Sequence, residues 1–192
     1  MKKKIIVFSL CSLCFVFVWG QHSKKKTYSF HSINCLGLAN GSTGFSPAMQ
    51  TVNGFLSGPW FAGIGLGLDY YQYRTVPFFA DVRYEYGKKN NKVFAYADAG
   101  INFSWTQDNL KYVSTIWNGN RSNNFNNGFY TDAGIGLTSL IKNGNALILS
   151  LGISRKTLEE KISYDDWRSN KPQTDIYTYR LNRVILKTGF RF

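Results

Sequence analysis

Serine and aspartate side chains in two polar stretches are the residues of this sequence that could support hydrolysis or acyl transfer. These residues are Asp108, Ser114, Ser122, Asp165 and Asp166. A serine hydroxyl becomes a good nucleophile beside a base that takes its proton, and neither stretch contains a histidine. We therefore predict no catalytic residue, and we interpret the two adjacent aspartates as a solvated turn rather than a catalytic pair.

The side chains that bind metals are equally sparse. After the first twenty residues the sequence keeps His22, His31 and Cys35. Their spacing matches no known metal site, and a single cysteine cannot form an intramolecular disulfide. We expect no metal and no cofactor, and we interpret Cys35 as a buried apolar residue.

Charged side chains form the third group with possible chemistry. Nine of them share one face of successive alternating segments: Asp69, Asp81, Arg83, Glu85, Asp98, Asp132, Lys156, Arg183 and Lys187. Acids and bases are interspersed and nearly balanced, as expected of charges that pair in a narrow interior. We predict a lumen charge network that holds the interior together. A conduction path is the alternative, and it is disfavoured because eight strands enclose only enough space for side chains.

The elements that carry these residues alternate between apolar and small or polar positions. In residues 60–73, Ile64, Leu66 and Leu68 share one face, whereas Gly65, Gly67 and Asp69 share the other. Period two is the pattern of a β-strand. The same pattern recurs in residues 76–86, 93–105, 129–141, 146–156 and 184–192. Residues 28–38 and 49–57 alternate poorly, and we place strands there mainly because the topology requires them.

The predicted connections alternate in length along the chain. The short ones are residues 58–59, 87–92 and 142–145, and the longer polar ones are residues 39–48, 106–127 and 165–174. The link near Arg74 and Thr75 breaks this order. Transmembrane barrels place short turns on the periplasmic side and longer loops outside.

A soluble barrel of the lipocalin kind could be built from the same segments with its apolar face inward. Three features favour the inverted arrangement, in which the apolar face meets lipid. The charges are balanced, and the charged face is rich in glycine, which suits a crowded interior. Aromatic residues also lie at segment ends, where the girdles of a membrane barrel fall: Trp60, Tyr84, Tyr86, Trp105, Phe129, Phe190 and Phe192. We predict an all-β fold, an eight-stranded antiparallel transmembrane barrel.

The first twenty residues differ from the rest of the chain. Three lysines precede an apolar stretch, residues 5–19, as in a secretory signal peptide. We expect residues 1–20 to be removed and residues 21–192 to form the barrel. Loss of the three lysines takes the net charge from +12 to +9. For an exported protein this basicity favours anionic lipid head groups over nucleic acid.

The C-terminus resembles the signal by which the barrel-assembly machinery recognises outer-membrane proteins. Val184, Leu186, Phe190 and Phe192 fit that pattern, and Thr188 departs from it. Together with the signal peptide and the alternating strands, this ending is similar to the small OmpX-like or OmpA-like barrels of Gram-negative bacteria. The resemblance implies an outer-membrane location, both termini in the periplasm, and outer-membrane lipid and lipopolysaccharide as neighbours.

A fold of this kind does not fix a function. The segment 106–127 carries Tyr112, Trp117, Arg121 and Phe125 among many asparagines. Exposed residues of these types often anchor recognition, although they could equally be covered by the loop itself. We expect a non-enzymatic envelope protein with a structural, surface-interaction or accessory-subunit role, which could include a place in a larger envelope complex. The alternatives are a lipid-modifying enzyme and a narrow pathway for small hydrophobic molecules.

Overall fold

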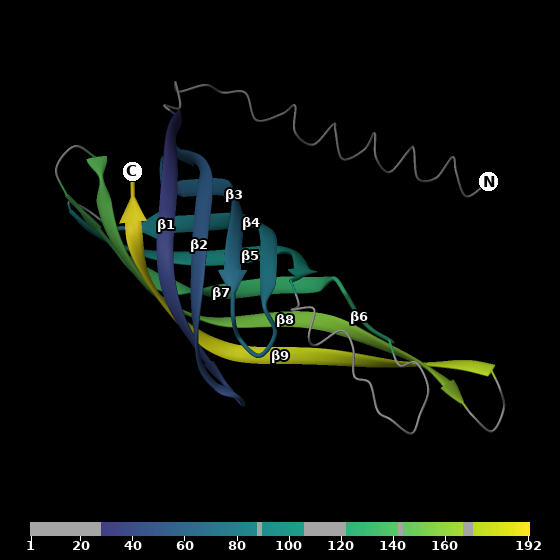
Figure 1. Cartoon of the computed structure of the whole chain (residues 1–192). Coiled ribbons are helices and arrows are strands. Elements are labelled where there is room, and N and C mark those ends of the chain that lie inside the picture. Colours follow the sequence, from purple (N-terminus) through teal and green to yellow (C-terminus); the bar gives the residue numbers. More distant parts are fainter. Residues whose placement is uncertain (1–27, 88–89, 106–121, 142–143, 167–170) are drawn as a thin grey trace, which may run out of the picture.

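The computed structural model describes residues 28–87, 90–105, 122–141, 144–166 and 171–192. All elements of this part are strands: β1 (Tyr28–Gly41), β2 (Gly44–Ser57), β3 (Trp60–Asp69), β4 (Thr75–Tyr86), β5 (Asn91–Ser104), β6 (Ser122–Asn126), β7 (Gly128–Leu140), β8 (Ala146–Asp166) and β9 (Lys171–Arg191). Every pairing is antiparallel, and β8 pairs with β9 to close the sheet. β6 lies outside the closed ring and pairs only with β8. The prediction of an eight-stranded antiparallel barrel is confirmed (Figure 1).

The strands are staggered around the barrel. A path through paired residues leaves β1 at His31, crosses Gly63 of β3 and Asp98 of β5, and passes Arg183 of β9. It returns to β1 at Gly41, ten positions further along. Such a stagger requires the strands to tilt, and eight tilted strands enclose an interior that side chains can fill.

Three predicted loops are wrong in their bounds. β1 and β2 are joined at residues 42–43, so most of the predicted loop 39–48 is strand. Residues 122–126 form β6 instead of loop, and β8 and β9 extend through most of the predicted loop 165–174. Asp165 and Asp166 therefore belong to a strand and not to a turn. Polar residues on both faces hide the period of two in these segments.

Aromatic rings fill much of the interior. Phe61, Phe79, Phe94 and Tyr130 are almost fully buried, and the Phe79 and Tyr130 rings lie 5.2 Å apart. Glycine makes room for them, because a Cβ atom at Gly65 would come within 2.4 Å of the Phe79 ring. Close approach to a ring thus accounts for a glycine on the inner face.

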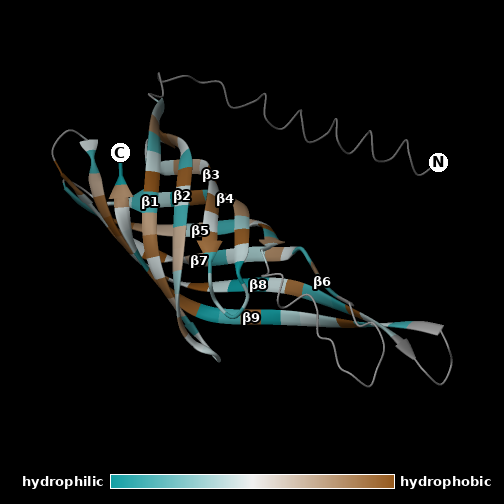
Figure 2. Cartoon of the chain, viewed as in Figure 1, coloured by the Kyte–Doolittle hydropathy of each residue, from teal (hydrophilic) through white to brown (hydrophobic). Residues whose placement is uncertain are grey.

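The outer wall is apolar. Ile64, Ile135, Leu151 and Ile153 are each at least half exposed and point away from the interior. Figure 2 shows this alternation as bands along the strands. A wall of exposed aliphatic side chains around buried charges is the inverse of a soluble barrel and is the polarity of a transmembrane one.

The predicted signal peptide lies outside the described residues, which begin at Tyr28, and it stays a prediction. In the part of the chain that the structure describes, no helix is long and apolar enough to cross a membrane.

Candidate functional site: the charged interior and the β-arm

All nine charged residues predicted for the lumen lie inside the barrel. Each is at most 6% exposed, and Lys156 is completely covered. Arg191 is buried beside them, although it was not among the residues predicted for the network. It lies on the same face of β9 as Arg183 and Lys187, so the parity of its position was the signal that could have found it. The charges form three groups along the barrel.

The first group surrounds Asp69 near the end of the barrel away from the termini. The Lys156 ammonium lies 3.2 Å from one carboxylate oxygen, and Arg183 contacts the other. Lys156 also donates to the Tyr73 carbonyl and the Thr75 hydroxyl. One acid therefore joins β3, β8 and β9 across the interior.

The second group is a row of three aspartates on neighbouring strands. Asp98 is the paired residue of both Asp81 and Asp132. Arg83 holds Asp81 with hydrogen bonds of 2.8–3.0 Å. Lys187 lies 2.8 Å from Asp132 and 3.8 Å from Asp98. Like charges directly opposite one another destabilise a sheet, so Lys187 is the cation on which two of the acids depend.

Neutral polar side chains complete this row. The Gln50 carbonyl accepts a hydrogen bond of 3.1 Å from Lys187, and its amide donates one of 2.6 Å to the Tyr130 hydroxyl. Tyr96 donates to Asp132 at 2.9 Å. Gln50, Tyr96 and Tyr130 were not among the predicted site residues, because nothing in a neutral side chain marks it as a partner of a charge.

The third group lies toward the termini, where Glu85 contacts Arg191 and lies 3.0 Å from the Lys92 ammonium. The C-terminus is close by, since the Nδ1 atom of His31 donates to the Phe192 carbonyl at 2.9 Å. Cys35 is buried and is not in a disulfide. The described residues hold no cluster of three potential metal ligands.

β8 and β9 continue beyond the barrel as a long hairpin. β7 pairs with β8 as far as Lys156, and β1 pairs with β9 as far as Arg183. Beyond these points β8 and β9 pair with each other up to Asp166 and Lys171, and β6 lies along β8. We call β6 with residues 157–166 and 171–182 the β-arm. Figure 1 shows it projecting from the end of the barrel opposite the C-terminus.

A small cluster orders the base of the β-arm. The Tyr73 ring lies 5.3 Å from Phe125 and 5.2 Å from Tyr179. Glu160 accepts hydrogen bonds from Tyr179, at 2.5 Å, and from Asn123. The bond to Glu160, with burial, raises the pKa of the Tyr179 phenol. Further out, Ile176 and Tyr177 are 60% and 49% exposed.

The predicted outer-loop contacts are only partly described. Tyr112, Trp117 and Arg121 lie outside the described residues, as do Asp108 and Ser114, which were considered for catalysis. Phe125 is half-buried against Tyr73 and so belongs to the base of the β-arm. The predicted assembly signal, Val184, Leu186, Phe190 and Phe192, points outward from β9 and the terminus; its recognition stays a prediction.

Among the solved structures that resemble this chain are those of three outer-membrane proteins. Neisserial surface protein A has 11% sequence identity and a TM-score of 0.49, with 86% of this chain and 98% of that chain covered. A major outer membrane protein from Thermus thermophilus has 13% identity and a TM-score of 0.49, with 85% and 100% covered. The outer membrane protein AlkL has 9% identity and a TM-score of 0.48, with 90% and 93% covered.

No protein-family profile and no curated sequence matches this chain. The strand order, the closure between β8 and β9, and the apolar wall around paired charges are properties of the chain itself. By these properties the chain is an eight-stranded antiparallel β-barrel with the apolar outer wall and charged interior of a transmembrane barrel.

Proposed function

We propose that the protein is a non-enzymatic barrel of the outer membrane that holds the β-arm outside the cell as a surface for binding a partner. The observation that carries this proposal is the length of β8 and β9. Each has 21 residues, whereas β3 has 10 and β4 has 12. The extra residues form a three-stranded extension that the barrel itself does not need.

The interior supports a scaffold role better than transport. Lys156, Arg183 and Lys187 each contact an acid from a distant strand, and aromatic rings occupy the space between the groups. Moving a solute through would require these pairs to separate, and an unpaired buried charge costs several kcal/mol. The β-arm, by contrast, presents exposed Ile176, Tyr177 and Arg180, and tyrosine and arginine often anchor interfaces.

The arrangement also supports an orientation with both termini in the periplasm. β1 begins and β9 ends on the side of the connections after Ser57 and Leu140, whereas the β-arm, the longest extension of the described residues, lies on the opposite side together with the short β1–β2 turn. Short turns face the periplasm and longer extensions face outward in barrels of this kind.

A photo-crosslinking amino acid at Tyr177 tests the proposal in living cells. We expect a discrete adduct with one envelope or extracellular component, because this side chain is half exposed on the β-arm. The matched control is the same amino acid at Phe129, which is also exposed and aromatic but lies on the barrel wall. The adduct should be absent there, and it should disappear when Asn-Gly replaces residues 163–174.

A membrane-impermeant maleimide supplies the control for orientation. Thr178→Cys on the β-arm should be labelled in intact cells, whereas Asn90→Cys near the turn before β5 should be labelled only after lysis. Labelling of Asn90→Cys but not of Thr178→Cys in intact cells would show the opposite orientation. Equal amounts of adduct at Tyr177 and Phe129, or no adduct at Tyr177, would contradict the proposal that the β-arm binds a partner.

A further inference from the structure

The apolar wall is interrupted by polar side chains on two adjacent strands. Ser32 and Asn34 of β1 and Thr51 and Asn53 of β2 point outward with the lipid-facing residues, and the two asparagines are exposed. Ser32 pairs with Asn53, and Asn34 pairs with Thr51, so the four side chains are neighbours. We call them the polar patch.

The polar patch lies within the apolar band and not at its rim. Paired residues on neighbouring strands do not lie at the same height along the barrel axis. The ten-residue stagger is spread over eight strands, so each step to the next strand changes the height by little more than one residue. With this correction Asn34 lies at about the height of Ile64, Ile135 and Leu149, which form the wall on other strands. The aromatic residues Phe30 and Trp60 lie nearer the termini. The amides of the polar patch therefore face hydrocarbon.

The amide groups of the patch have few partners within the chain. Asn34 donates one long hydrogen bond, 3.3 Å, to the Ser32 hydroxyl. Within the described residues the Asn53 side chain makes no hydrogen bond. An asparagine amide has two donor hydrogens and an acceptor oxygen, and lipid tails can satisfy none of them. Polar side chains within a membrane normally face another protein surface.

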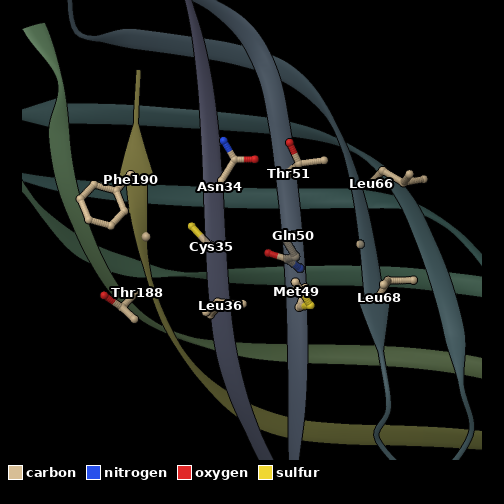
Figure 3. A pocket seen from close by; sticks show the side chains of 12 residues that line it. Asn34, Cys35, Leu36, Met49, Gln50, Thr51, Leu66, Leu68, Thr188 and Phe190 are labelled. Carbon is tan, nitrogen blue, oxygen red and sulfur yellow. The ribbon is translucent and has the colours of Figure 1, made fainter.

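The wall is hollowed beside the patch. A depression of about 440 Å³ crosses β9, β1, β2 and β3, and Asn34 and Thr51 line it together with Leu66, Thr188 and Phe190. Figure 3 shows these side chains around it. Short side chains at Thr51 and Thr188 leave room beside longer neighbours, and small residues allow close approach between membrane-embedded surfaces.

We propose that a second copy of this chain covers the polar patch, in a symmetric dimer within the membrane. A two-fold axis along the membrane normal turns β1 of one copy toward β2 of the other. Because Asn34 and Asn53 lie on these two strands at nearly the same height, Asn34 then meets Asn53 of the second copy, and the contact occurs twice. An amide both donates and accepts, so each member of a pair can donate one hydrogen bond to the other and accept one from it.

This dimer is independent of the proposed surface role of the β-arm. Association of the chains is measured by energy transfer between dyes in lipid vesicles. Copies carry donor or acceptor dyes at Thr178→Cys, since Cys35 is buried. The unmodified chain should associate. The double variant Asn34→Leu/Asn53→Leu should associate more weakly, with a dissociation constant raised about tenfold or more. Thr131→Leu, an exposed polar position on the opposite wall, is the matched control and should leave association unchanged.

Cross-linking tests the geometry separately from the affinity. A tagged Asn34→Cys chain is mixed with an untagged Asn53→Cys chain, and disulfide formation between them should be faster than either self-reaction. The leucine variants should still migrate as folded barrels on gels without heating, because leucine suits a lipid-facing site. A chain that is monomeric at every dilution, unchanged association in the leucine double variant, or equal cross-linking rates would each overturn the dimer.

Discussion

Replacing Lys187 by methionine should lower the free energy of unfolding by about 3–5 kcal/mol, because it leaves buried carboxylates without their cation. Lys187 lies 2.8 Å from Asp132 and 3.8 Å from Asp98, and Asp81 is the next paired residue in the same row. Methionine keeps much of the side-chain length, so the loss reports mainly on charge. The measurement is a urea titration of the barrel in lipid vesicles.

A double-mutant cycle separates charge pairing from packing. Asp132→Asn in the Lys187→Met background removes one of the unpaired acids, so it should restore part of the lost stability, whereas Asp132→Asn alone should destabilise. The two changes should therefore be strongly non-additive, as expected of contacting residues. Additive losses would show that the row of aspartates does not depend on Lys187.

Replacing Leu151 by arginine should cost about 2–4 kcal/mol in the bilayer, because it places a charge on the lipid-facing wall far from both rims. Leu151 is 52% exposed and lies midway along the barrel part of β8, paired with Ile135 and Leu186. In a soluble barrel the same side chain would meet water, and arginine would be harmless. Unfolding in vesicles of defined lipid composition measures the difference.

A second arginine provides the control for this wall prediction. Thr178→Arg introduces the same side chain on the β-arm, where Thr178 is exposed. We expect a change of less than about 0.5 kcal/mol there, as for ordinary surface substitutions. Equal effects at Leu151 and Thr178 would mean that the wall does not contact hydrocarbon.

The alternation of side chains was enough to predict the barrel, because a strand with one greasy face leaves a period of two in the sequence. β4 and β5 follow their predicted ranges closely, whereas β3 ends at Asp69, four residues before the predicted end at Tyr73. β1 and β2 alternate poorly for a reason that the structure shows. Their outward positions include Ser32, Asn34, Thr51 and Asn53, so the lipid-facing side is polar where the other strands are aliphatic.

The β-arm was missed for a related physical reason. β6 and residues 171–180 of β9 are mostly polar on both sides, and a strand outside the membrane needs no apolar face toward lipid. Such a strand resembles a loop in sequence. Its pairing depends on β8 continuing past the barrel, which is a tertiary property.

For the charged interior, parity alone indicates which face each residue occupies. Which charges contact one another depends on the stagger of the strands, and the alternation of side chains does not reveal that stagger. Asp69 contacts Lys156 and Arg183, which are more than 80 positions later in the sequence. No local pattern relates such distant positions. Arg191 shares their parity but lay outside the predicted network, although it contacts Glu85.

Contact between isoleucine methyl groups and lipid tests the inverted wall most directly. The chain is labelled only at the isoleucine δ-methyl groups and placed in lipid nanodiscs, and nuclear Overhauser effects to the acyl chains are recorded. We expect cross-peaks for the outward Ile64, Ile135 and Ile153, and none for the buried set: Ile33, Ile148 and Ile185. Cross-peaks for the buried set, with none for the outward one, would show that the apolar face points inward and would contradict the transmembrane barrel.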